Sequence, residues 1–149
     1  MAITQAIANS FKKELLEGQH EFQFGGDKFK LALYSSSATL NSATTSFTTT
    51  GQVGDSGTYT SGGGALVQPN PSTAIGSGTG AGVAYVDFND LSFTSATITA
   101  RGALIYNTSA SNKAVAVLDF TSDKISTDGT FTIIFPAFTT SAAILRISG

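Results

Sequence analysis

The C-terminal part of the chain, residues 83–149, is a series of short apolar runs separated by turn-forming residues. Runs rich in Val, Ile, Thr, Tyr and Phe and bounded by Gly, Asn, Asp and Ser are typical of β-strands. The six runs are VAYVDF, LSFT, ATITARGALIYN, AVAVLDF, GTFTIIFPAF and AAILRIS, with turn clusters that include NTSASNK and TSDKISTDG. Six strands in this region predict a mainly β protein, built as an antiparallel β-sandwich or a jelly-roll-like domain.

Composition agrees with a single β-rich domain over residues 1–149. Only 12% of the residues are charged, about half the roughly 25% of an ordinary soluble domain, and Ser, Thr and Gly take their place. Several runs, such as AVAVLDF and GALIY, are apolar on both faces, which predicts central strands that are covered on both sides. Pro136, after FTIIF, is expected to end its strand or to lie at a sheet edge.

An N-terminal α-helix is predicted over residues 1–18. Ile3, Ile7, Phe11 and Leu15 follow one another at a spacing of four and make one apolar stripe, and Gly18 is a natural end for the helix. Docking of this stripe is expected to stabilise the helix.

A β-hairpin is predicted over residues 19–34. Alternating apolar residues lie on each side of Gly25-Gly26, in HEFQF and DKFKLALY. Lys28 and Lys30 are expected on the face of the hairpin that contacts water.

A long Ser/Thr/Gly-rich loop is predicted over residues 35–82, with a short strand at residues 65–68 and the main strand-rich core following at residues 83–149. A loop of this length in a compact domain usually has a function or is ordered by a partner. Uncharged hydroxyl side chains can hydrogen-bond to another protein's backbone, so one hypothesis is an extended arm that lies on a partner.

The glycine-rich stretch GSGTGAG formally fits a dinucleotide-binding pattern at Gly76, Gly78 and Ala81. That pattern needs a strand before it and a helix after it, so that the helix N-terminus can hold the pyrophosphate. Here VQPNPSTA precedes the glycines and the strand-like VAYVDF follows them. We interpret the stretch as a flexible loop that enters a strand.

No catalytic, cofactor-binding or metal-binding residue can be assigned. The chain has one histidine, His20, and no cysteine; we interpret His20 as a partly exposed turn residue and expect neither disulfides nor thiolate chemistry. Asp87 with Asp90, and Asp119 with Asp123, could supply oxygen ligands to calcium, but they lack the complete loop motif. Aspartates at turns and strand ends explain them more simply, and whether either pair binds a cation stays open.

Two further features have a structural and a functional interpretation. Asn107-Thr108-Ser109 matches the glycosylation acceptor pattern, but we assign it to a hairpin loop. Arg101 interrupts a strongly apolar strand. A buried or interfacial arginine there needs a carboxylate or carbonyl partner, whereas an outward-facing one needs none, and both interpretations stay open.

Charge and hydropathy argue against two classes of partner. The net charge of −2 and the scattered Lys and Arg residues provide no basic face for direct binding of nucleic acid. No apolar run approaches the roughly 20 residues that span a bilayer. In MAITQAIANSFKK the lysines follow the apolar residues, the reverse of a secretory signal, so we expect a protein made in the cytoplasm.

Two blocks of the sequence resemble small structural proteins from the virions of tailed bacteriophages, a group that includes capsid decoration or cement proteins. They are MAITQAIANSFKKELLEGQHEF with DKFKLALYSSSATLN, and LSFTSATITARGALIYNTSASNKAVAVLDFTSDKISTDGTFTIIFPA with AAILRIS. The resemblance covers about two thirds of the chain and carries over no functional residue. It implies a β-rich, non-enzymatic virion component, present in many copies and made in the cytoplasm of the host bacterium.

The function expected from this resemblance is decoration of the capsid exterior. The partners would be the major capsid protein and other copies of the chain, with a trimer as one possibility, while the N-terminal helix or the Ser/Thr-rich loop reaches across a capsomer boundary. One alternative is a tail or head-fibre protein for host-surface attachment, with Tyr59 or Tyr85 exposed at a shallow site. A glycan hydrolase would need a pair of carboxylates in a cleft, and spacing alone identifies no such pair.

Overall fold

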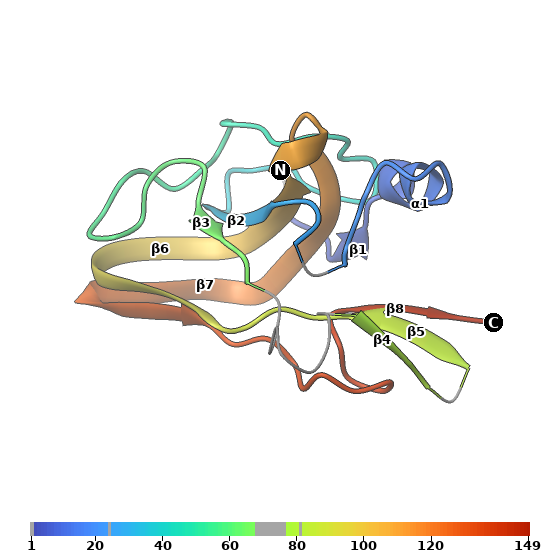
Figure 1. The fold of residues 1–149 in the computed structure, drawn as a ribbon. Coiled ribbons are helices and arrows are strands. Elements are labelled where there is room, and N and C mark those ends of the chain that lie inside the picture. Colours follow the sequence, from blue (N-terminus) through green and yellow to red (C-terminus); the bar gives the residue numbers. More distant parts are fainter. Residues whose placement is uncertain (1, 24, 68–76, 81) are drawn as a thin grey trace.

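The protein is mainly β, with 47% of its residues in strands and 8% in helical structure. The computed structural model describes residues 2–23, 25–67, 77–80 and 82–149. Within these residues a five-stranded antiparallel sheet has the order β1-β7-β6-β2-β3, and a three-stranded one has the order β4-β5-β8. Figure 1 shows the two sheets as separate layers, with α1 beside the larger one. The elements are β1 (Ala6–Ile7), α1 (Asn9–Leu16), β2 (Phe29–Tyr34), β3 (Gly64–Ala65), β4 (Ser77–Gly80), β5 (Val83–Val86), β6 (Leu91–Asn107), the 3-10 turn η1 (Thr108–Ala110), β7 (Lys113–Ile133) and β8 (Leu145–Ser148). The antiparallel, sandwich-like prediction is confirmed.

One long hairpin, β6–β7, forms the centre of the fold. Its strands contain 17 and 21 residues, and each one merges two runs that the sequence presents as separate strands. TSDKISTDG, predicted as a turn, lies inside β7 and pairs with β6 across several register shifts. The prediction of a turn there is wrong because the turn-forming residues occupy irregular positions within the strand: Thr121 and Asp128 have positive φ values of 67° and 44°. Both ribbons bend back on themselves at the same end (Figure 1).

The turn between β6 and β7 is where the sequence predicts it. NTSASNK contains η1, and the Asn107 side chain accepts hydrogen bonds from the amides of Ser109 and Ala110. Ser111 then adopts a left-handed conformation that reverses the chain. At the other end of the hairpin β7 stops at Ile133, before Pro136, as expected for a residue that cannot donate to the ladder.

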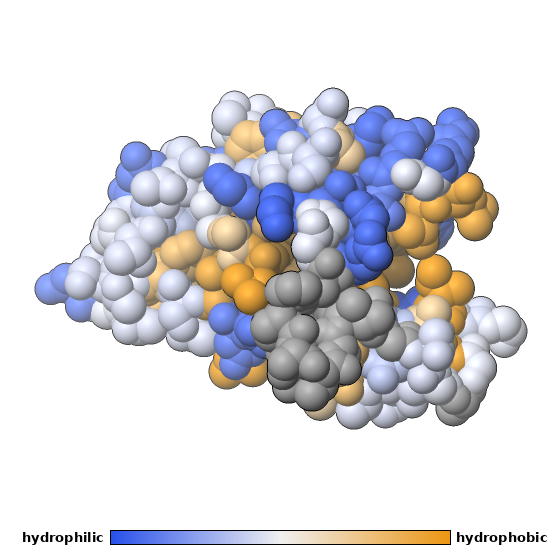
Figure 2. Space-filling model, viewed as in Figure 1, coloured by the Kyte–Doolittle hydropathy of each residue, from blue (hydrophilic) through white to orange (hydrophobic). Residues whose placement is uncertain are grey.

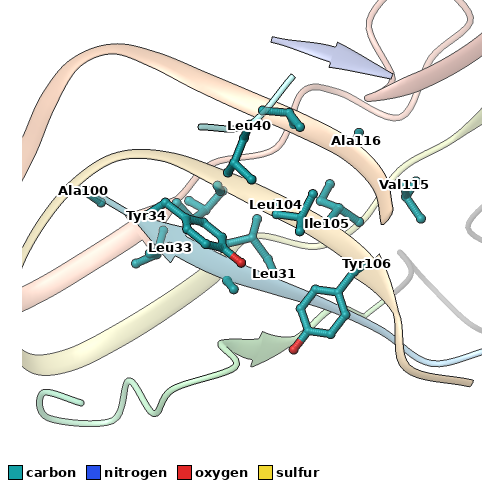
Figure 3. Close-up of a cluster of buried hydrophobic side chains, with 14 of the residues drawn as sticks. Leu31, Leu33, Tyr34, Leu40, Ala100, Leu104, Ile105, Tyr106, Val115 and Ala116 are labelled. Carbon is teal, nitrogen blue, oxygen red and sulfur yellow. The ribbon is translucent and has the colours of Figure 1, made fainter. Parts of the chain in front are cut away.

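The core lies around β2 and the adjoining half of the β6–β7 hairpin. In β2, Leu31 and Leu33 point to one face of the sheet, and Ala32 and Tyr34 point to the opposite face. All four side chains are fully buried. Leu104 and Ile105 of β6 are buried beside them (Figure 3). Full burial of one such side chain contributes about 1.5–3 kcal/mol. The prediction of strands covered on both faces is confirmed.

The N-terminal helix is shorter than predicted. Within the described residues 2–18, only Asn9–Leu16 is helical, and Ala6–Ile7 is instead an edge strand that pairs with β7. Ile3 forms a parallel bridge with Leu40. The spacing of four is compatible with a helix over residues 1–18, but pairing with the open edge of β7 satisfies the backbone of residues 6–7 in another way.

The predicted hairpin at residues 19–34 is wrong. β2 pairs with β6 and β3, and residues 19–23 form no strand, while Phe24 lies outside the described residues. A turn closes this segment, with the Gly26 amide bonded to the Gln23 carbonyl and the Asp27 amide bonded to the Glu21 carbonyl. Pairing along all six residues of β2 with β6 replaces the short local pairing that the alternation indicated.

The described part of the Ser/Thr/Gly-rich segment lies against the domain itself. The amide of Thr58 donates to the Thr94 carbonyl at 3.1 Å, and the Thr94 amide donates to the Thr58 hydroxyl at 2.8 Å. The Thr97 amide donates to the Ser56 hydroxyl at 2.8 Å. The hydroxyls therefore cover the outer edge of β6. β3 falls at the start of the strand predicted for residues 65–68, and Gln68 lies outside the described residues.

Buried tyrosines fasten this segment to the sheet. Tyr59 is fully buried, which corrects the expectation that it is exposed, and its hydroxyl accepts from the Leu33 amide at 2.9 Å. The Tyr34 hydroxyl donates to the Thr48 carbonyl at 2.7 Å, and the Tyr106 hydroxyl donates to the Gly62 carbonyl. Burial raises the pKa of Tyr59 to about 12 and also raises the pKa values of Tyr34 and Tyr106.

We expect the protein to lose stability at high pH through these tyrosines. Their pKa values are raised on folding, so their contribution is complete below an unfolded-state pKa of about 10 and is lost as the pH rises. For Tyr59, a folded pKa of about 12 corresponds to a loss of roughly 2–3 kcal/mol across this window. Urea denaturation at pH 8, 10 and 11, with tyrosinate absorbance recorded in parallel, measures the effect. A free energy of unfolding that stays constant to pH 11 would contradict it.

Candidate interaction surface

An apolar groove lies between α1 and the three-stranded sheet; we call it the helix–sheet groove. Its volume is about 370 Å³. Figure 2 shows apolar atoms on both sides of the hollow. The lining residues are Ile7, Phe11, Leu15, Phe22, Thr79, Ala84, Tyr85, Val86, Leu145, Arg146 and Ile147. Nine of these eleven residues have hydrocarbon or aromatic side chains, so the groove is suited to apolar groups.

Strand register builds the lower wall of the groove. Val86 of β5 is paired with Leu145 of β8, and Ala84 is paired with Ile147. Directly paired residues of an antiparallel sheet point to the same face, and residues two apart share that face. Leu145 is buried, whereas Ile147 is 59% exposed. The wall therefore begins in the core and ends at the surface.

Helix α1 builds the upper wall. Phe11 is buried and Leu15 is half-buried, as the apolar stripe of the sequence predicts. Leu16, the last residue of the helix, is 91% exposed. Together with Ile147 it gives the molecule two protruding apolar side chains, one on the element that forms each wall of the groove.

The sequence indicated part of this surface. The pattern predicts the apolar stripe with Phe11 and Leu15, but the docking of this stripe opposite β5 and β8 depends on pairing between residues far apart in the chain. Tyr85 is half-buried, lies at the groove and has its ring centre 4.9 Å from that of Phe138. Arg146 also borders the groove, and its Nη1 atom donates to the Ser141 carbonyl at 2.8 Å.

His20 is the centre of a buried polar network, which corrects its interpretation as a partly exposed turn residue. Its Nε2 atom lies 2.9 Å from Oε2 of Glu14, and its Nδ1 atom lies 3.0 Å from Nδ2 of Asn107. Asn107 Nδ2 also donates to Asp27 at 2.7 Å. Lys113 Nζ lies 3.6 Å from the other oxygen of Glu14. The network fastens the C-terminal part of α1 to the β6–β7 turn.

The hydrogen bonds of Asn107 fix the tautomer of His20. The Asn107 carbonyl oxygen accepts from the amides of Ser109 and Ala110 at 2.9 Å and 3.2 Å, so its NH₂ group must face the imidazole. Nδ1 of His20 is then an acceptor, and Nε2 carries the proton that is donated to Glu14. Each side chain named in this network has a partner within it, and together these contacts hold α1 in position.

The aspartates of the first pair, Asp87 and Asp90, each accept a hydrogen bond from a backbone amide. Asp87 is buried, its Oδ1 atom accepts from the Phe88 amide at 2.9 Å, and burial raises the pKa of its carboxyl. Asp90 is exposed, and its Oδ1 atom accepts from the Phe135 amide at 2.8 Å. Among the residues that the structure describes, no group of three or more His, Asp or Glu side chains could hold a metal ion.

Arg101 is paired, which decides between its two interpretations. Its Nε atom lies 3.1 Å from Oδ1 of Asp119, and both side chains are partly exposed. The same Asp119 oxygen accepts from the Thr121 amide at 2.8 Å. This hydrogen bond, more than Arg101, holds the pKa of Asp119 below its ordinary value. Asp119 thus stabilises the irregular conformation at Thr121, while Asp123 is exposed.

Two sequence motifs have structural roles. Asn107 of the glycosylation pattern is fully buried, so the folded chain presents no acceptor nitrogen there. Of the glycine-rich pattern, Gly76 and Ala81 lie outside the described residues, and Gly78 belongs to β4, which pairs with β5. Residues 77–80 of the glycine stretch therefore form a strand rather than a loop, and a turn at Gly82 leads into the next strand.

Comparison of the chain with protein-family models, with curated proteins and with solved structures gives no match. Among the helices of the described residues, none combines the length and the hydropathy that a membrane span requires.

Proposed function

We propose that the protein is a non-enzymatic structural component of a tailed-bacteriophage virion, and that it binds the outside of the capsid lattice as a decoration or cement protein. In this proposal it is made in the cytoplasm of the host bacterium, its partner is the major capsid protein, and its copies also contact one another. The two sequence blocks that resemble phage structural proteins support the proposal, and so does the β-rich fold.

The helix–sheet groove is the observation that supports attachment to another protein. Large apolar side chains that protrude beside an apolar hollow are typical of a surface that a partner covers. Ile147 lines the groove and is 59% exposed, and Leu16, which follows the lining residue Leu15 in α1, is 91% exposed. An apolar segment of the capsid protein in the groove would bury both side chains as well as the lining.

Attachment of many copies explains how weak contacts could stabilise a shell. A ligand that binds the closed lattice but not its separated subunits shifts the equilibrium toward the closed lattice. A protein that contacts two neighbouring capsomers gains further from its high effective concentration at the second contact. Rigid attachment through a formed groove would also avoid the entropy loss of ordering a free arm.

The test uses capsids that lack the protein. We expect the purified wild-type chain to produce ordered density at regular shell positions in cryo-electron microscopy and to raise the temperature at which the capsids rupture. Leu16→Lys and Ile147→Lys are each expected to weaken binding by about tenfold or more, since each would place a charge at the covered surface. Both residues are exposed, so the variants should fold normally.

Val67→Lys is the matched control, because Val67 is another exposed apolar residue, 57% exposed, and unlike Leu16 and Ile147 it does not belong to an element that forms a wall of the groove. Capsid binding that is equal in all four proteins would show that the groove is not the contact. A bare shell together with binding to host cells would contradict the proposal and support the attachment function. In that alternative Tyr59 cannot take part, because its side chain is buried.

A further inference from the structure

Strand β7 folds back on itself, so that its two ends form two arms that face each other (Figure 1). The ring centres of Phe120 and Phe131 are 6.5 Å apart, although the same number of residues in a straight strand would span roughly 36 Å. Thr121 and Asp128, with their positive φ values, lie between these two rings in the sequence. The two arms of β7 therefore enclose apolar space.

On the side of β6, residues 56–59 close this space. The Tyr59 ring centre lies 4.9 Å from that of Phe93 in one arm of β6. The Tyr59 hydroxyl bonds to the amide of Leu33, which pairs with the other arm of β6. Ser56 and Thr58 hydrogen-bond to the backbone of β6 beside this ring. Tyr59 thus acts as a bridge between the two arms.

On the side of β7, the same space opens as a groove of about 540 Å³, which we call the edge groove. Its lining includes Leu118 and Phe120 from the first arm, and Phe131 and Ile133 from the second. Ile134 also lines it and is 76% exposed. The volume lies within the range of roughly 300–1,000 Å³ that is typical of ligand-binding clefts.

The second arm of β7, residues 129–133, has an uncovered outer edge beside this groove. Strand β1 pairs with β7 only at Ala116 and Val117, in the first arm. Within the described residues no strand pairs with the outer side of the second arm. An uncovered strand edge is a template for pairing with another chain.

Two contacts indicate which amides face outward in the second arm. The Phe135 amide points toward β6, because it donates to the Asp90 side chain. The side chains of Ser92 and Thr132 are hydrogen-bonded at 2.9 Å, as expected for a directly opposed pair whose backbones do not bond to each other. Since amides alternate in direction along a strand, Thr130 and Thr132 present theirs at the free edge.

The edge groove carries one uncompensated charge, and it is positive. Of its two charged lining residues, Asp119 is paired with Arg101 at 3.1 Å. Lys124 has no ion-pair partner in the part of the chain that the structure describes, and its ammonium donates to the Ser122 hydroxyl at 3.0 Å. The adjacent Asp123 does not line the groove. A ligand with an acidic group would complement Lys124.

We propose that the edge groove binds an extended segment of another protein, which adds as a strand to the outer edge of residues 129–133. Backbone groups of this segment bond to Thr130 and Thr132. Its alternate side chains are apolar and enter the groove, and an acidic side chain pairs with Lys124. Main-chain pairing supplies affinity in such strand addition, while the pockets for alternate side chains supply specificity.

This binding site is independent of the proposed function. The edge groove and the helix–sheet groove have no lining residue in common. Strand addition can therefore be measured with peptides, in the absence of capsids, and its failure is distinguishable from failure of capsid binding. Two separate surfaces would also allow one copy to contact two proteins at once, each contact raising the effective concentration at the other.

A library of random twelve-residue peptides, selected against the full-length wild-type chain, tests the proposal. We expect enriched peptides that alternate apolar residues and contain Asp or Glu. Lys124→Glu and Ile134→Asn should each weaken their binding by about tenfold or more, through loss of the ion pair and of apolar contact. A peptide whose acidic residue is replaced by lysine should bind Lys124→Glu more tightly than it binds the wild type.

The same substitutions elsewhere are the matched controls. Lys12→Glu reverses the charge of an exposed lysine that lines neither groove, and Ile147→Asn removes an exposed isoleucine from the helix–sheet groove. Neither control should weaken the enriched peptides, and circular dichroism verifies that all four variants are folded. The proposal is overturned if no peptide is enriched, or if none of the enriched peptides loses affinity in both edge-groove variants alone.

Hydrogen exchange measured by NMR distinguishes strand addition from binding through side chains only. The amides of Thr130 and Thr132 should exchange rapidly in the free protein and at least about tenfold more slowly with an enriched peptide bound. Unchanged exchange at both positions would contradict strand addition. Sedimentation equilibrium of the wild type alone gives a further result: self-association that Lys124→Glu and Ile134→Asn both abolish would mean that a second copy, and not another protein, occupies the groove.

Discussion

Replacement of Gly63 by alanine is expected to lower the free energy of unfolding by about 3 kcal/mol or more, enough to unfold a chain of ordinary stability. Gly63 has a φ of +85°, and a Cβ atom there would lie 1.8 Å from the Leu31 carbonyl oxygen and 2.7 Å from the Ala32 Cα atom. These are backbone atoms of β2, buried in the core. The next residues, Gly64–Ala65, pair with β2, so the chain cannot move away without breaking that pairing.

Two other glycines distinguish the effect of the steric clash from the effect of the positive φ. Gly54 has no atom within 4 Å of its Cβ position and no positive φ, so Gly54→Ala should change stability by less than about 0.5 kcal/mol. Gly18 also has open space but a φ of +72°, and Gly18→Ala should cost about 1 kcal/mol. Urea denaturation of the three variants measures these differences. If Gly63→Ala lowered the free energy of unfolding no more than Gly18→Ala does, the close approach of residue 63 to β2 would be wrong.

Replacement of Asn107 by leucine, a side chain of similar size, is expected to cost about 3 kcal/mol. The Asn107 side chain makes four hydrogen bonds, to two backbone amides, to His20 and to Asp27. The leucine would fill the space but leave these partners unsatisfied, and His20 has no exposed side-chain surface from which to bond water. A buried polar group without its partner costs about 1–3 kcal/mol.

Thr108→Val is the comparison for Asn107→Leu, because the Thr108 hydroxyl makes one hydrogen bond, to the Lys28 carbonyl at 2.9 Å. Its loss should cost about 1 kcal/mol. Urea denaturation gives both free energies, and nitrogen-15 NMR of the imidazole should show the Nε2-protonated tautomer in the wild type. Equal stability of the two variants, or the opposite tautomer, would mean that Asn107 does not hold His20 as the structure shows.

The strands could be predicted from the sequence because their signal is local. The alternation and the β-branched runs of residues 83–149 indicate strands without reference to a partner, and NTSASNK indicates the turn between β6 and β7. The merging of strands was not predictable in the same way. TSDKISTDG has the composition of a turn. It is part of β7 because β6 pairs with β7 both before and after each register shift.

The sites that were missed depend on contacts between distant residues. His20 is buried because Glu14 and Asn107 converge on it, and Asn107 is far away in the sequence. Glu14 itself gave a signal: it lies three residues after Phe11, within the apolar stripe of the helix, where a carboxylate needs a buried partner. No comparable pattern in the sequence indicated that β5 and β8 lie opposite α1, so the helix–sheet groove could be identified only from the structure.

The hairpin geometry has a consequence for how the chain reaches its native state. The turn at η1 brings Asn107 and Lys113 together with a short loop, so pairing of β6 with β7 can begin there at a small entropic cost and proceed outward to Leu91 and Ile133. β2, in contrast, leaves the ribosome well before β6, and until β6 is made its strand partner is the two-residue β3. Its buried run FKLALY is therefore the segment most open to premature association during synthesis, and rapid closure of the β6–β7 turn limits the time for which it is unprotected.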